Sequence, residues 1–191
     1  MLLTFGVTNT TGSPTFGAGA TASMLTGVAI DLPNFVTVQS GTFSPGTKLD
    51  TLLNSSSASL PPFGSFELAI ADNGNLLGGN ANGALAAGAS DTASLIVSLN
   101  AGSSAINNAM ELALAMQTGF NSQPTDLSHL KAAVRFQQVN AGEGSDKLLY
   151  NPPEPPTPDP DDNPEVAPEP GSLLVWAAIG GLVTAARRRK G

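Results

Sequence analysis

Residues 3–8 read LTFGVT, and this stretch sets the pattern that most of the chain repeats. Its apolar residues Leu3, Phe5 and Val7 alternate with small or polar residues. A period of two is typical of a β-strand that turns one face to a core and the other to solvent. The stretch therefore predicts a strand at the start of the chain.

The same alternation recurs at four later places before residue 150. Segments rich in Gly, Asn and Pro separate these places, and such segments favour turns between short strands. The sequence therefore predicts an all-β domain over residues 1–150, a β-sandwich of jelly-roll-like kind. The later alternating rows are Val28, Ile30 and Leu32; Phe66, Leu68 and Ile70; Leu95, Val97 and Leu99; and Val134 with Phe136.

Residues 108–118 give conflicting indications. Met110, Leu112, Leu114 and Met116 occupy every second position, as in a strand. Ala, Leu, Met and Glu dominate the same segment, and all four favour a helix. We predict a strand here on the strength of the alternation.

The composition changes abruptly after Tyr150. Residues 151–170 read NPPEPPTPDPDDNPEVAPEP and hold nine of the fifteen prolines. Such a segment has too little apolar surface to form a core, and its prolines and like charges keep it extended. We expect a disordered, proline-rich linker over residues 151–167.

Three elements follow in order at the carboxyl end. They are Pro168-Glu169-Pro170, an uncharged stretch over residues 171–186, and the basic cluster Arg187, Arg188, Arg189 and Lys190. An apolar stretch in lipid forms a helix because only internal hydrogen bonds satisfy its backbone. This helix would rise about 24 Å, which is less than the ~30 Å thickness of the hydrocarbon core. Snorkelling arginines and local thinning of the bilayer would close the difference. Basic residues beside a membrane helix stay in the cytoplasm, so they fix the orientation and place residues 1–170 outside.

The order and spacing of these three elements closely resemble the PEP-CTERM sorting signal of Gram-negative surface proteins. Residues 132–148, AAVRFQQVNAGEGSDKL, also resemble the closing segment of many domains that carry this signal. The resemblance implies processing by an exosortase, with Pro168, Glu169 and Pro170 as recognition residues. It also implies a transient membrane anchor, and then a place on the cell surface or in the extracellular matrix, where such proteins accompany exopolysaccharide and biofilm.

Two alternatives to this interpretation stay open. A proline-rich linker could precede a buried or dimerising carboxyl-terminal helix, in which Gly180 and Gly181 serve close packing. Members of the resembled family also carry an amino-terminal signal peptide, and Met1 is followed directly by strand-like sequence, with Lys48 as the first basic side chain. A signal peptide needs a basic start and an apolar run. Either the true start lies upstream, or the chain is a fragment, or the protein is no longer exported; of these three we expect the first.

The inventory of reactive side chains is small. The chain has one histidine, one tyrosine and no cysteine, and it carries no nucleophile elbow, zinc-binding helix or phosphate loop. We predict no enzyme activity, cofactor or metal. A net charge of −7 without a basic face also argues against nucleic-acid binding.

Three weaker functional hypotheses remain. His129 lies near Asp126 and Ser128 and could serve a hydrolase. The turns at residues 72–75 and 143–146 could hold calcium through their oxygen atoms. The domain could instead bind carbohydrate on the cell surface, provided that loops gather Phe16, Phe35, Phe43 and Phe63 into one stacking platform.

Overall fold

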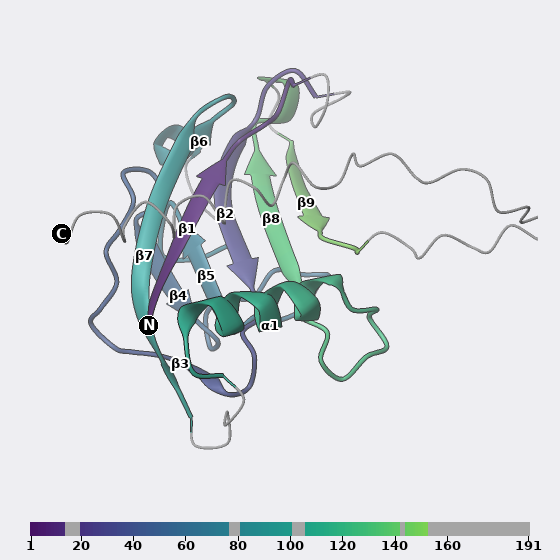
Figure 1. Ribbon diagram of the computed structural model, residues 1–191. Coiled ribbons are helices and arrows are strands. Elements are labelled where there is room, and N and C mark those ends of the chain that lie inside the picture. The colour runs from purple at the N-terminus through teal and green to yellow at the C-terminus, as the bar shows by residue number, and fades with distance from the viewer. Residues whose placement is uncertain (14–19, 77–80, 101–105, 142–143, 153–191) are drawn as a thin grey trace, which may run out of the picture. The chain divides into compact units, whose positions relative to one another are not determined.

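The computed structural model describes residues 1–13, 20–76, 81–100, 106–141 and 144–152. These residues belong to one compact unit, Met1–Pro153. They are mostly β-sheet with one short α-helix (Figure 1), so the prediction of an all-β domain is confirmed at this level. The strands are β1 (Leu2–Thr8), β2 (Met24–Ile30), β3 (Val36–Val38), β4 (Thr51–Asn54), β5 (Leu68–Ala71), β6 (Leu85–Ala86), β7 (Ser90–Leu99), β8 (Ala132–Gln137) and β9 (Ser145–Leu149); the helices are α1 (Ala109–Asn121) and the 3-10 turns η1 (Ala81–Gly83) and η2 (Val139–Ala141).

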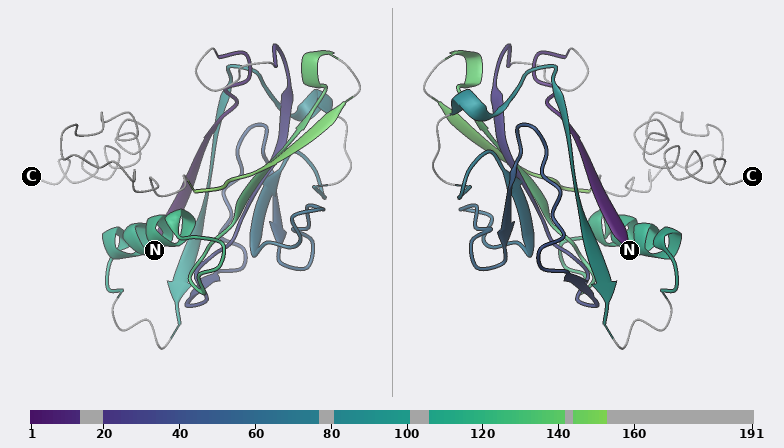
Figure 2. Two further views of the ribbon diagram at one scale, coloured as in Figure 1. Left: turned by 90° about the vertical axis from the view of Figure 1, so that its right-hand side faces the viewer. Right: turned by 90° about the vertical axis from the view of Figure 1, so that its left-hand side faces the viewer.

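Within the described residues the strands form two antiparallel sheets. The smaller sheet has the order β1-β7-β3, and the larger has the order β4-β5-β2-β8-β9 with β6 also paired to β2. The two sheets form two layers, which the side views in Figure 2 show nearly edge-on. The five predicted strands all exist, as β1, β2, β5, β7 and β8.

The pairing of β1 with β7 shows how the alternating pattern becomes a layer. Leu3 lies opposite Leu95 and Phe5 opposite Ala93, so apolar side chains face the interior in pairs. In β7 the residues Ala93, Leu95 and Val97 are buried, and the intervening residues are half-buried or exposed. The odd-numbered residues of both strands therefore supply one side of the interior between the two sheets.

The larger sheet supplies the other side of this interior. Ile30 and Leu68 from its central strands pack with Leu95 and Val97 from β7. Leu25 and Ile70 pack with Ala93 in a neighbouring cluster. Burial of these side chains stabilises the two layers against each other, at about 25 cal/mol per Å² of apolar surface removed from water.

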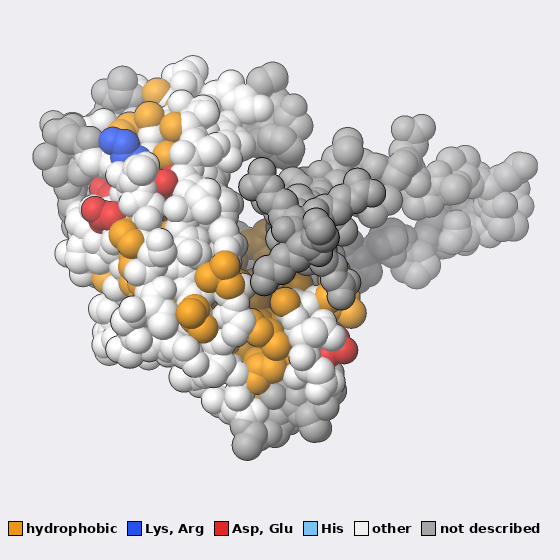
Figure 3. All heavy atoms as spheres, turned by 60° about the vertical axis from the view of Figure 1, so that its left-hand side comes forward, with side chains coloured by type: hydrophobic (Ala, Val, Ile, Leu, Met, Phe, Trp, Pro, Cys, Tyr) orange, Lys and Arg blue, Asp and Glu red, His pale blue; other side chains and the backbone are white. Residues whose placement is uncertain are grey.

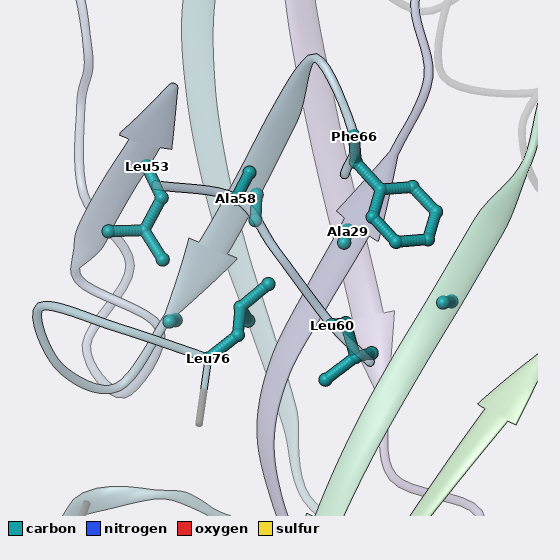
Figure 4. Packing of buried hydrophobic residues seen from close by; sticks show 9 residues of the cluster. Ala29, Leu53, Ala58, Leu60, Phe66 and Leu76 are labelled. Carbon is teal, nitrogen blue, oxygen red and sulfur yellow. The ribbon is translucent and has the colours of Figure 1, made fainter. Parts of the chain in front are cut away.

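A second apolar cluster covers the opposite face of the larger sheet. Ala29, Ala69 and Ala133 form one row across β5, β2 and β8, because Ala29 pairs with both of the others. These small side chains leave room for Leu60 and Phe66, which come from the segment between β4 and β5 and lie over the sheet (Figure 4). All four residues of β5 are consequently buried, although antiparallel sheets often leave one face to solvent.

The prediction of a strand over residues 108–118 is wrong, because α1 occupies this segment. Asn108 caps the helix, and its side chain accepts hydrogen bonds from the backbone N–H groups of Met110 and Glu111. Leu112 is buried, and Met116 packs in the same cluster one turn later. Met110 and Leu114 are instead more than half exposed. The apolar residues therefore follow the period of a helix, and their regular alternation misled the prediction.

Several large apolar side chains reach the surface of the described part. The face in Figure 3 shows such side chains over a broad area with few charged ones. Scattered exposed apolar residues are normal for a soluble surface. The exposed ones are Leu2, Ile96, Met110, Leu114, Leu127, Leu148 and Tyr150.

The carboxyl-terminal predictions fall almost entirely outside the described residues. Only Asn151 and Pro152 of the linker are described, and the expected membrane helix at 171–186 is not. Among the described residues, no helix has the length and apolar character needed to cross a bilayer.

Candidate functional site

A cleft lies between α1 and the segment that follows β2. Its volume is about 760 Å³, which falls in the range of small-molecule sites. One wall is the segment from Asp31 to Phe35, and a second is the side of α1 that carries Glu111, Ala115 and Gly119. The loop after α1 closes the third side with Leu127, Ser128, His129 and Leu130.

Strand pairing brings three charged residues to one end of this cleft. Ile30 at the end of β2 lies opposite Leu68 of β5 and Ala132 of β8. The next position outward on each strand carries Asp31, Glu67 and Lys131 respectively. Asp31 is therefore flanked by a carboxylate on one side and an ammonium group on the other. Asp31 and Glu67 line the cleft, and Lys131 contacts Asp31.

Hydrogen bonds hold Asp31 in place. Its backbone N–H donates to the carbonyl oxygen of Lys131 at 2.8 Å, and its Oδ2 accepts from the Lys131 backbone N–H at 3.0 Å. The Lys131 Nζ lies 3.8 Å from the same Oδ2. Lys131 is itself positioned by the Ser65 carbonyl at 3.0 Å and by the Phe66 ring, whose centroid is 4.6 Å from Nζ.

Asp31 and Glu67 form a carboxylate pair. Burial, with a further contribution from the neighbouring Glu67 carboxylate, raises the pKa of Asp31 to about 6, and the contacts with Lys131 lower it in part. A like charge nearby disfavours the ionised form of a buried carboxyl group. Glu67 also accepts a hydrogen bond from the Leu32 backbone N–H at 3.2 Å, which fixes it at the mouth of the pair.

A third carboxylate enters the cleft from α1. Glu111 lies in the first turn of the helix, where a negative charge is favourable. Its Oε2 accepts a hydrogen bond from the backbone N–H of Asn107, so the side chain completes the cap that Asn108 begins. The role in capping fixes Glu111 on the wall of the cleft.

Apolar side chains form the rest of the lining. Phe35, Ile106 and Leu114 line the side next to α1, and Leu130 lies against Gly119 of the helix. A Cβ atom at position 119 would lie 2.7 Å from two Leu130 carbon atoms, so glycine permits this close approach. The cleft thus combines an apolar wall with carboxylates at one end.

His129 borders the cleft, but its contacts fix the loop. Its Nδ1 lies 2.8 Å from the carbonyl oxygen of Ser122. The Asp126 carboxylate accepts a hydrogen bond from the backbone N–H of Gln123 at 3.0 Å, so it is engaged within the loop. These contacts join the end of α1 to the approach to β8. They account for His129 without the hydrolase hypothesis.

The turn after β5, at residues 72–75, was one of the two calcium candidates. Burial raises the pKa of Asp72, and the nearby Arg135 lowers it in part. A cation in this place would have to compete with the Arg135 guanidinium, so the turn gives the calcium hypothesis no support. The other candidate includes Glu143, which lies outside the described residues. Within the described ranges, no three His, Asp or Glu side chains gather as they would around a metal ion.

The proposed aromatic platform is not assembled from the described phenylalanines. Phe35 and Phe43 pack against the cluster between the sheets, and Phe63 packs against the cluster on the opposite face. Phe16 lies outside the described residues. Phe35 is the member of this set that lines the cleft.

A second buried carboxylate, Asp91, lies away from the cleft at the start of β7. It accepts hydrogen bonds from the backbone N–H groups of Thr47, Lys48 and Leu49 at 3.0, 2.8 and 2.8 Å. The backbone N–H of Thr92 is a fourth donor at 2.9 Å. Burial alone would raise the pKa of Asp91, but these donors lower it to about 2.

Of the candidates named from the sequence, Phe35, Ser128 and His129 line the cleft, and the predicted sorting residues do not belong to it. Pro168, Glu169 and Pro170 lie outside the described residues, as do Arg187, Arg188, Arg189 and Lys190. The sequence analysis singled out none of the cleft carboxylates Asp31, Glu67 and Glu111. Asp31 and Glu67 each lie within a predicted alternating row, so a prediction of the pairing of β2 with β5 would have found them.

No family model, no curated protein and no solved structure matches this chain in the comparisons made with each.

Proposed function

We propose that the protein is exported, sorted by a PEP-CTERM-type signal at its carboxyl end, and placed on the cell surface or in the extracellular matrix. The observation that carries this proposal is the order of Pro168-Glu169-Pro170, an uncharged stretch and Arg187 to Lys190 at the end of the chain. A membrane protease or transpeptidase of the exosortase type would recognise the motif while residues 171–186 cross the bilayer. The protein serves a structural role in an exopolysaccharide or biofilm matrix.

The position at which the folded domain ends supports this proposal. In the part of the chain that the structure describes, the last strand ends at Leu149, and the proline-rich run begins at Pro152. Tyr150 ties this exit to α1, because its hydroxyl donates to Asn121 Oδ1 at 3.0 Å. A domain that is complete before the linker keeps its fold when the tail is removed. In this proposal the domain is a jelly-roll-like sandwich and the tail a removable anchor.

The second candidate function is recognition of extracellular carbohydrate by the same domain. The cleft favours it, because a cavity of about 760 Å³ with carboxylate oxygens can accept hydrogen bonds from sugar hydroxyl groups. Retention of the protein on defined polysaccharides, with competition by free sugar, separates this role from a structural one. Retention that saturates and is competed would favour recognition.

Mass spectrometry of the mature carboxyl terminus tests the sorting proposal. The chain is expressed behind a secretion leader in hosts with and without an exosortase. Glu169→Gln is compared with Glu165→Gln, which makes the same change in the linker outside the motif. We expect removal of the tail near Pro170 in the exosortase-containing host for the natural chain and for Glu165→Gln, and its retention for Glu169→Gln. Full-length chains of all three in both hosts would contradict the proposal.

A further inference from the structure

The Asp31–Glu67 pair is the feature of the described residues that neither the fold nor the sorting proposal explains. The two side chains lie at neighbouring positions on adjacent strands at the wall of an open cleft, and their like charges repel each other. A cation bound between their oxygens would relieve this repulsion.

Among the described residues, three other ionisable groups contact the pair or line the cleft. Lys131, on the approach to β8, lies behind Asp31 and is held by Ser65 and Phe66. Glu111 on α1 and His129 in the following loop line the cleft. Lys131 therefore compensates one of the three cleft carboxylates, and the cleft itself keeps an excess of negative charge.

The remainder of the lining limits the size and character of a ligand. Phe35, Ile106 and Leu114 provide an apolar wall beside the carboxylates. A hydrated metal ion would gain nothing from this wall. An organic ammonium group with a short apolar body would place its charge on the carboxylates and its carbon atoms on the wall.

We propose that the cleft binds an organic ammonium group, which sits between the carboxylates of Asp31 and Glu67 with its apolar body along α1. This binding site goes beyond export and sorting and does not depend on them. A free amine and the side chain of a lysine residue present the same chemistry. Binding competes with protonation of Asp31, so the protein releases a proton on binding only where Asp31 is protonated beforehand, at a pH below about 6.

Titration of the full-length protein with n-butylammonium, followed by amide NMR, tests this assignment. The amides of Leu32 and Lys131 donate to Glu67 and Asp31, so their signals report occupancy of the pair. We expect shifts centred on these amides, and binding about tenfold weaker at pH 5 than at pH 7 because protons then compete for the pair. A peptide with one internal lysine is titrated in parallel, and tighter binding of the peptide would identify a protein side chain as the natural ligand.

Neutral and charge controls make the test decisive. 1-Butanol has the same body without the charge, and we expect it to bind at least about tenfold more weakly. Glu67→Gln should weaken n-butylammonium by about tenfold, and Glu111→Gln, which retains a capping oxygen, by less. Asp146→Asn removes the same charge on β9 outside the cleft and should leave binding unchanged. Equal binding of butanol, or equal effects of Glu67→Gln and Asp146→Asn, would overturn the proposal.

Discussion

Asp31 and Asp91 are both aspartates at strand ends and nearly equal in exposure, at 8% and 9%, yet their surroundings are opposite. Burial is the largest cause of the raised pKa of Asp31, about 6, and the Glu67 carboxylate on the neighbouring strand adds to it. Four backbone N–H groups lower the pKa of Asp91 to about 2 despite its burial. Burial disfavours the charge of both carboxylates, and the number of backbone donors decides whether that effect is offset.

The difference separates a structural carboxylate from a candidate binding group. Asp91 joins the segment at Thr47, Lys48 and Leu49 to β7, and its donors are backbone N–H groups together with the Thr47 hydroxyl. Asp31 has one backbone donor, a neighbour of the same charge and one partly exposed ammonium group, that of Lys131, at 3.8 Å. We therefore expect the ionised carboxylate of Asp31, and not that of Asp91, to lower the free energy of unfolding at neutral pH.

Asp91→Asn should give the largest effect. The amide can accept from only some of the four donors and turns its own N–H₂ toward others, so we expect a loss of about 3 kcal/mol in the free energy of unfolding at pH 7. Because the folded pKa is lowered, the contribution of Asp91 is complete above the ordinary value of 3.8 and disappears as the pH falls through about 2. Urea unfolding at pH 7 and pH 2 measures the loss of stability and its dependence on pH. A loss equal to that of Asp146→Asn would contradict a structural role for Asp91.

Asp31→Asn should have a smaller effect of the opposite sign. The raised folded pKa means that the native state is favoured below 3.8 and loses this advantage as the pH rises through about 6. Asparagine imitates the protonated acid, because it can donate to Glu67 and still accept from the Lys131 backbone. We expect a gain of about 1 kcal/mol at pH 8 and none at pH 4 in urea unfolding. Equal destabilisation at both pH values would contradict the assignment of the strain to this pair.

Lys131→Met should have the smallest effect of the three. The substitution keeps the apolar stem near Phe66 and removes the ammonium group, whose Nζ lies 3.8 Å from Asp31. Partly exposed ion pairs contribute little, so we expect a loss below about 1 kcal/mol at pH 7. The loss should shrink at pH 5, where Asp31 is protonated. A loss that does not change between these pH values would show that Lys131 stabilises the protein through contacts other than that with Asp31.

The sequence predicted the strands on either side of Asp31 but not their partners. Alternation along residues 28–32 and 66–70 identifies two strands, because a core face and a solvent face impose a period of two. Nothing in either segment states that Ile30 pairs with Leu68, and that register alone brings Asp31 to Glu67. Long-range pairing depends on the whole sheet, so the carboxylate pair could not be predicted.

The helix α1 could have been predicted from its amino-terminal cap. Asn108 followed three residues later by Glu111 is a capping pattern, and the residues between favour a helix. Leu112, Met116 and Phe120 then fall on one face at helical spacing, and they pack against the interior. The strand prediction gave the alternation more weight than the cap, and so missed the helix that forms one wall of the cleft.

A carboxyl ¹³C NMR titration of the full-length protein tests the contrast between Asp31 and Asp91 most directly. Selectively labelled aspartates, assigned through Asp31→Asn and Asp91→Asn, are followed as the pH is lowered from 8. The structure predicts a midpoint of about 6 for Asp31 and about 2 for Asp91. Midpoints for both near the ordinary aspartate value of about 4 would contradict the carboxylate pair and the backbone-held carboxylate together.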